Sequence, residues 1–129
     1  MTINHSSLPS LSQDSFQQSS SLEHLNLDNN NIHQLPVNFL AGLNHLMSLS
    51  LAWNSLETLE SYQFGSLSSL EFLDLSHNNL SSVSSEALVR TVKLRLVKLD
   101  HNRLTQLSAQ LILPLSHLTN IALQARTIL

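Results

Sequence analysis

The stretch LEFLDLSHNNL, which runs from Leu70 to Leu80, decides how this chain folds. In it, Leu70, Leu73 and Leu75 are followed by Asn78 and Leu80. The same arrangement returns every 24 residues along the chain. The first leucines of the successive copies are Leu22, Leu46, Leu70, Leu94 and Leu118. A fixed period of this length predicts a solenoid that stacks one repeated unit.

Each unit is predicted to begin with a short strand. Leu73 and Leu75 are two positions apart and point to the same face of a strand, because strand side chains alternate between faces. One unit is too small to bury this apolar face alone, so it must stack on a neighbour that has leucines at the same positions. The strands then align side by side in a parallel sheet.

An asparagine follows each of the first four strands. These residues are Asn30, Asn54, Asn78 and Asn102. The backbone turns inward at this point and leaves polar groups that strand pairing cannot satisfy. Because an amide both donates and accepts hydrogen bonds, a column of stacked asparagines is predicted to satisfy these groups from unit to unit. The fifth unit has Arg126 at this position.

With these residues in place, the chain resembles the leucine-rich repeat family. Apolar residues also recur in the back half of the unit, as at Leu35, Leu40 and Leu43. This pattern is similar to the typical class of repeat found in Toll-type receptors, chaoptin-like adhesion proteins and matrix proteoglycans. The resemblance implies an α/β fold: a right-handed solenoid with a concave parallel sheet, and loops with short 3₁₀ or helical turns on the convex side.

The repeat domain is predicted to span residues 22–129, with units that begin at 22, 46, 70 and 94 and a partial unit at 118. Residues 1–21 are interpreted as the back half of an earlier, degenerate repeat, with Leu8, Leu11 and Phe16 at its apolar positions and its strand missing or cut away. Solenoids need polar caps at their ends, and none is recognisable here. We therefore expect a partial chain rather than a complete small protein.

The convex segments are expected to be loops with short turns. Residues 37–43 and 61–67 have the spacing for one turn each, and the segment from Glu86 to Arg90 is expected to form a slightly longer helix. Pro114 argues against a regular helix between Gln110 and Ser116.

Composition narrows the classes of function. The net charge of −3 gives no basic footprint for nucleic acid. Apolar runs are short, so no transmembrane helix and no direct membrane contact are expected of this segment. The chain has no cysteine, although secreted proteins favour disulfides. Two explanations stay open: a fragment whose disulfide-bonded caps lie elsewhere, or an intracellular protein.

Function is expected on the concave face, at the second, third, fifth, seventh and eighth positions of each unit. The eighth positions are Asn29, Trp53, His77, His101 and Ala125, and the third positions are His24, Ser48, Phe72, Leu96 and Asn120. Two pairs of opposite charge, Asp74 with Lys98 and Glu71 with Arg95, lie between these rows. The predicted ligand-binding residues are Trp53, Phe72, Asp74, His77, Leu96, Lys98 and His101.

Each of these residues has a structural alternative. Trp53 is either a binding anchor or a cover for its own strand end. Phe72 and Leu96 form either a binding hot spot or an ordinary cross-strand pair, and the charged pairs are expected to contribute little to stability. His77 and His101 are expected side by side, but two imidazoles without a third fixed ligand make a weak site, so no metal is predicted.

Two further patterns bear on function. The chain has no catalytic triad motif, zinc-protease motif or phosphate-binding glycine loop, so neither an enzyme nor a cofactor is expected. Asn4 and Asn79 each begin a sequon for N-glycosylation, which favours the secretory pathway.

The sequence therefore predicts a protein-recognition module, part of an extracellular or cell-surface receptor or adhesion protein that binds a protein ligand through its concave face. A cytoplasmic scaffold or regulatory protein is the alternative. Homotypic contact through uncapped ends is a third, weaker interpretation, and a capped chain that stays monomeric in sedimentation would contradict it.

Overall fold

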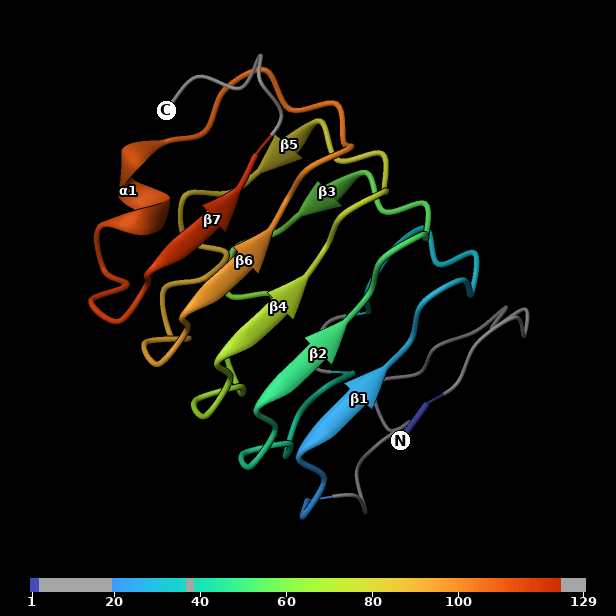
Figure 1. Cartoon of the computed structure of the whole chain (residues 1–129), viewed down its shortest axis with the longest axis vertical. Helices are drawn as coiled ribbons and strands as arrows, with labels where there is room; N and C mark the ends of the chain where they lie inside the picture. Colours follow the sequence, from blue (N-terminus) through green and yellow to red (C-terminus); the bar gives the residue numbers. More distant parts are fainter. Residues whose placement is uncertain (3–19, 37–38, 124–129) are drawn as a thin grey trace.

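Five short parallel strands form the main sheet of the computed structural model, which describes residues 1–2, 20–36 and 39–123 (Figure 1). The strands are β1 (His24–Asn26), β2 (Ser48–Ser50), β4 (Phe72–Asp74), β6 (Leu96–Lys98) and β7 (Asn120–Ala122). They are hydrogen-bonded in the order β1-β2-β4-β6-β7. Leu25 pairs with Leu49, Leu49 with Leu73 and Leu73 with Val97. Residues 24 positions apart in the sequence are thus paired in the sheet, and the predicted leucine-rich repeat solenoid is confirmed.

The apolar positions of the unit make one continuous core. Leu49, Leu51, Leu73 and Leu75 are fully buried on the inner side of the sheet. Phe64, from the back half of its unit, is buried in the same cluster. Side chains on the other side of the strands, such as Ser48 and Phe72, are only partly covered. The outward side of the five-stranded sheet, here called the sheet face, corresponds to the concave face expected from the sequence.

Near the amino terminus, a single described residue pairs with β1. The sequence suggested that the strand before the first clear repeat is missing or cut away. Thr2 forms a parallel bridge with Asn26, and the Asn26 N–H donates to the Met1 carbonyl oxygen at 2.8 Å. Leu8, Leu11 and Phe16, which suggested the degenerate repeat, lie outside the described residues.

Two further strands and one helix lie beyond the main sheet. Strands β3 (Thr58–Leu59) and β5 (Ser82–Val83) pair in parallel as a separate two-stranded sheet. Residues 61–67 form consecutive turns, as predicted, in which the Gly65 N–H donates to Tyr62 O and the Leu67 N–H to Phe64 O. The matching segment at 37–43 lies partly outside the described residues. No helix in the described part of the chain is long and apolar enough to cross a membrane.

Both helix expectations on the convex side were wrong. The segment from Glu86 to Arg90 forms turns with i→i+3 hydrogen bonds, as from Val89 N to Glu86 O, instead of a helix. The only helix among the described residues is α1 (Ala109–Ile112). It begins where the Ser108 side chain caps the Gln110 N–H, and it ends before Pro114, so the proline interrupts no helical hydrogen bond.

Gly42 occupies a position at which a side chain is expected to be costly. Its φ is +89°, in the left-handed region that glycine reaches without steric penalty. A Cβ added there meets no atom within 4 Å, so the cost of a side chain is backbone strain alone. Gly42→Ala is expected to lower the free energy of unfolding by about 1 kcal/mol. Urea unfolding checks this, and Gly42→Asn, which tolerates this conformation better, should cost less.

Candidate functional site

Three rings stack where strands β2, β4 and β6 have ended. Trp53, His77 and His101 occupy equivalent positions in successive repeats, and each has a left-handed backbone with φ of 57°, 56° and 56°. The Trp53 and His77 rings are parallel with centroids 3.8 Å apart, and the His77 and His101 rings are 4.1 Å apart. We call these three residues the ring row. Trp53 is the apolar residue of the ring row, and 57% of its surface is exposed.

The left-handed residues mark the point at which the chain turns into the core. The Trp53 N–H donates to Ser76 O and the His77 N–H to Asp100 O, so each turn is bonded to the next repeat. Positive φ is unusual for bulky side chains. Because the same turn recurs in each repeat, the side chains at this position leave the sheet in parallel, and aromatic residues there stack.

The asparagine after each turn lies buried in the core. Asn54 Oδ1 accepts from Ile32 N at 3.0 Å, and Asn54 Nδ2 donates to Leu27 O and Leu51 O, each at 3.0 Å. Asn78 and Asn102 make equivalent bonds. These amides therefore link each turn to the preceding repeat as well as to their own strand. Asn30, the first of the four, is also buried and donates to Leu27 O.

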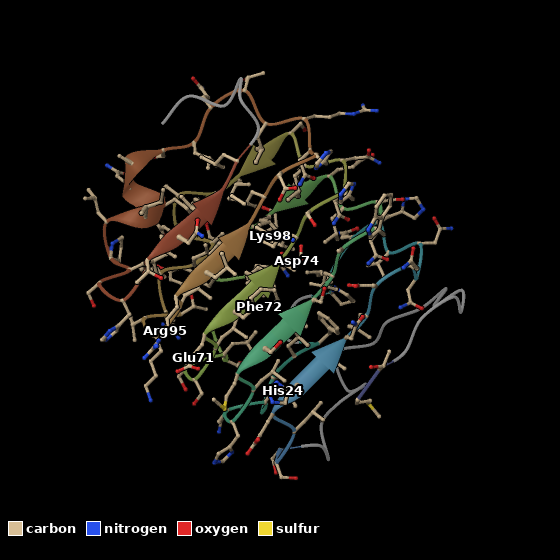
Figure 2. All side chains as sticks on the ribbon, in the orientation of Figure 1. His24, Glu71, Phe72, Asp74, Arg95 and Lys98 are labelled. Carbon is tan, nitrogen blue, oxygen red and sulfur yellow. The ribbon has the colours of Figure 1, made fainter. Side chains whose placement is uncertain are left out.

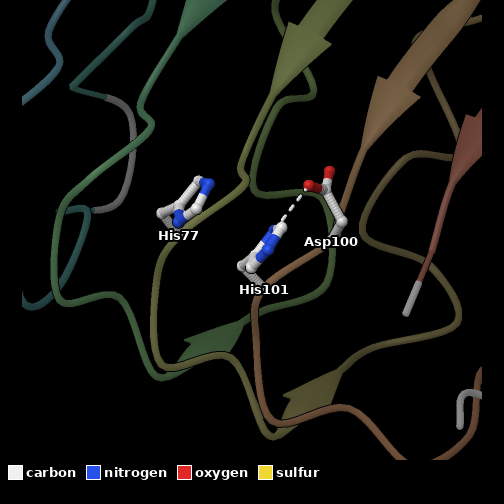
Figure 3. Close-up of side chains that lie close together, drawn as sticks. All are labelled: His77, Asp100 and His101. Atoms are coloured by element: carbon white, nitrogen blue, oxygen red, sulfur yellow. Dashed lines mark hydrogen bonds and ion pairs between the residues drawn. The ribbon is translucent and has the colours of Figure 1, made fainter. Parts of the chain in front are cut away.

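Asp100 holds the outer end of the ring row. His101 Nδ1 lies 2.8 Å from Asp100 Oδ2 (Figure 3). Burial alone would raise the pKa of Asp100, but the hydrogen bond from His101, a backbone hydrogen bond and the nearby charge of Lys98 outweigh it, so this pKa lies below its ordinary value. The carboxylate is therefore charged at neutral pH.

On the sheet face, Asp74 and Lys98 lie on β4 and β6, whereas Glu71 and Arg95 lie where these two strands begin (Figure 2). Lys98 Nζ lies 3.7 Å from Asp74 Oδ2, and Arg95 Nε lies 3.9 Å from Glu71 Oε1. The Arg95–Glu71 pair is exposed at this distance, so it contributes well under about 1 kcal/mol to stability.

Phe72 and Leu96 lie opposite each other in the register of β4 and β6, and both are half-buried. A shallow hollow of about 370 Å³ beside Phe72 extends over the sheet face toward β1. Its lining includes His24, Ser48, Ser50, Phe72 and Asp74.

The seventh position of the unit differs from the expectation that it faces solvent. Ala52 and Ser76 there are buried, with 4% and 3% of their surface exposed. Short hydrogen bonds account for this: Asp28 Oδ1 accepts from Ala52 N at 2.9 Å, and Asp74 Oδ1 accepts from both Ser76 N and Ser76 Oγ. Ala52 and Ser76 therefore offer little surface to a partner, whereas Asp28 and Asp100, at the same position of their units, are partly exposed.

The structure describes only one of the two sequons. Asn4 lies outside the described residues. Asn79 is half-buried in the turn after Asn78, where its main-chain N–H donates to Leu56 O at 2.9 Å. Ser81, which completes the sequon, is exposed.

Sequence comparison assigns the fold described above to a family. The leucine-rich repeat family matches residues 1–56, 20–80 and 44–104. The chain belongs to the leucine-rich repeat family. No curated protein sequence matches it.

Solved structures narrow the resemblance. One chain of the Drosophila Toll–Spatzle complex aligns with 84% of this chain at 21% identity and a TM-score of 0.78. A chain in the glycosylated form of that complex aligns with 88% at 28% identity and a TM-score of 0.80. These alignments cover 14% and 17% of the matched chains, so this chain spans about a sixth of their length. The resemblance to Toll-type receptors is therefore supported, and the chain is a repeat module of the protein-interaction kind.

Proposed function

We propose that this chain recognises a protein ligand through its sheet face, with the ring row as the anchor, as part of an extracellular or cell-surface receptor. The observation that carries the proposal is Trp53, a largely exposed indole presented on a rigid turn at the border of the sheet. Aromatic side chains supply a large share of the binding energy at protein interfaces and lose little conformational entropy there.

The surroundings of Trp53 support the same role. The indole cannot sink onto the core, because its left-handed backbone and the His77 ring hold it in the stack. Asp74 and Lys98 are paired on the neighbouring strands β4 and β6, and they offer a negative and a positive charge to a partner on the sheet face. The surface thus combines an apolar contact residue with charged residues around it, and protein interfaces usually have an apolar centre and a polar rim.

Similarity to the Toll–Spatzle complex adds support for a protein partner, because that structure contains a repeat-bearing chain in a complex with a second protein. Proximity labelling at the surface of the source cells, with this chain as the bait, tests the role by identifying the proteins that bind it. The parent chain and Tyr62→Ala should retain the same partner, whereas Trp53→Ala should lose it. Equal retention by all three chains would remove the ring row from the interface.

Glycosylation tests the compartment separately. We expect the native protein to migrate above the position of the 14.4 kDa chain and to shift down when N-linked glycans are removed. Asn79→Gln should abolish the part of that shift carried by the sequon at Asn79. A native band that does not move on deglycosylation would favour the cytoplasmic scaffold or regulatory protein instead.

A further inference from the structure

We propose that His77, Asp100 and His101 bind a divalent transition-metal ion such as Zn²⁺ at the border of the sheet face (Figure 3). One ligand atom from each residue can be chosen so that all three lie within 4.8 Å of one another. The sequence offered two imidazoles without a third fixed group. The structure supplies that group, because the carboxylate of Asp100 lies against His101.

The donor set fits zinc. Histidine nitrogens bind Zn²⁺ at about 2.0–2.1 Å and carboxylate oxygens at about 2.0–2.2 Å. His101 Nδ1 and Asp100 Oδ2 are already 2.8 Å apart, and a separation of roughly 3.3 Å would suit a tetrahedral ion between them. The ion takes the place of the shared hydrogen atom, and that proton moves to Nε2 of the same neutral ring. Only a small opening of this pair is needed.

His77 must turn to complete the site. Its ring is nearly parallel to that of His101, with an angle of 10° between the planes, so the lone pairs of the two rings do not converge in the stack. The side chain of His101 is 65% exposed and can also rotate. Metal binding therefore exchanges a ring contact for a coordinate bond, and it changes the surroundings of the indole 3.8 Å from His77.

Asp100 is suited to be the anionic ligand. Its side chain is only 23% exposed, which limits competition from water. Oδ1 of the same carboxylate is buried and has no hydrogen-bond partner among the described residues, so the group has spare acceptor capacity. Three protein ligands leave the fourth zinc position open on the solvent side, where water or a side chain of a bound partner can enter.

The test uses Zn²⁺ alone and needs no protein partner, so its outcome is independent of the proposed ligand-binding role. Trp53 is the single tryptophan of the chain, and its fluorescence reports on the neighbouring His77 ring. Titration with Zn²⁺ should give a saturable change with a micromolar dissociation constant, and a chelator should reverse it. His77→Gln, His101→Gln and Asp100→Asn should each weaken binding by at least about tenfold.

His24→Gln is the matched control, because His24 is an exposed histidine on the sheet face outside the cluster. Its zinc affinity should equal that of the parent. Circular dichroism establishes that each variant is folded, and if Asp100→Asn is not, the exposed His101→Gln variant decides. The inference is overturned if no saturable change occurs up to millimolar Zn²⁺, or if the His77 and His101 variants bind as tightly as the parent.

Discussion

Asn78→Leu is expected to lower the free energy of unfolding by about 3 kcal/mol or more. Asn78 Oδ1 accepts from the buried Leu56 N–H at 3.0 Å, and Asn78 Nδ2 donates to Leu51 O and Leu75 O at 2.9 and 3.1 Å. Leucine has a similar volume and leaves no cavity, but it cannot satisfy any of these groups. A buried polar group that loses its partner costs about 1–3 kcal/mol. Urea unfolding followed by circular dichroism measures the loss.

Asn79→Leu is the adjacent control. Asn79 bonds Leu56 O through its main-chain N–H, which a leucine retains. Its substitution is therefore expected to change the free energy of unfolding by less than about 1 kcal/mol. If the two leucine variants unfold at the same urea concentration, the buried amides do not stabilise the turns as described.

Trp53→Ala is expected to weaken binding of the protein ligand by at least about 30-fold, which corresponds to about 2 kcal/mol. The indole is the largest exposed apolar group of the ring row, so its removal takes away the central contact of the proposed interface. Stability should fall less, because the variant loses mainly one stacked ring pair, worth about 0.5–1.5 kcal/mol. Surface plasmon resonance and thermal unfolding measure the two effects separately.

Tyr62→Ala controls for the general loss of an exposed aromatic residue. Tyr62 is 51% exposed, has φ of 58° and lies under Arg90 in a cation–π contact on the convex side. It thus matches Trp53 in exposure and backbone strain but not in location. Its removal should leave ligand affinity unchanged. A loss of affinity in the tyrosine variant with none in the tryptophan variant would place the interface on the convex side.

The repeat itself could be predicted because one pattern of apolar residues occurs five times in the sequence at a constant interval. That pattern fixes both which side chains are buried and which residues are paired, as the register of Phe72 with Leu96 shows. The back of the unit was less predictable. Ser108 caps the helix that begins at Ala109, whereas the segment near Glu86 forms turns with i→i+3 hydrogen bonds; periodicity encodes neither of these local contacts.

The charged pairs, the adjacent histidines and the pairing of Phe72 with Leu96 were predicted from the columns, but the stacking of Trp53 on His77 and the contact of Asp100 with His101 were not. Nothing in the column of Trp53, His77 and His101 reveals that the backbone is left-handed there and aligns the rings. Asp100 was missed as a partner of His101, although it directly precedes His101 in the sequence. Adjacent residues in a strand point to opposite faces, and only the turn at the end of β6 lets these two side chains meet.

The buried asparagines also have a mechanical consequence. Three of the amides, those of Asn54, Asn78 and Asn102, join their own turns to the preceding repeat, as Asn102 does by donating to both Leu75 O and Leu99 O. A force applied to the two ends of the chain would therefore break these links one repeat after another. Each released unit of 24 residues adds roughly 80 Å of extended chain, whereas neighbouring strands in the folded sheet are about 4.8 Å apart. Under load, such a module would lengthen in discrete steps and would shorten again as each unit restacked on its neighbour.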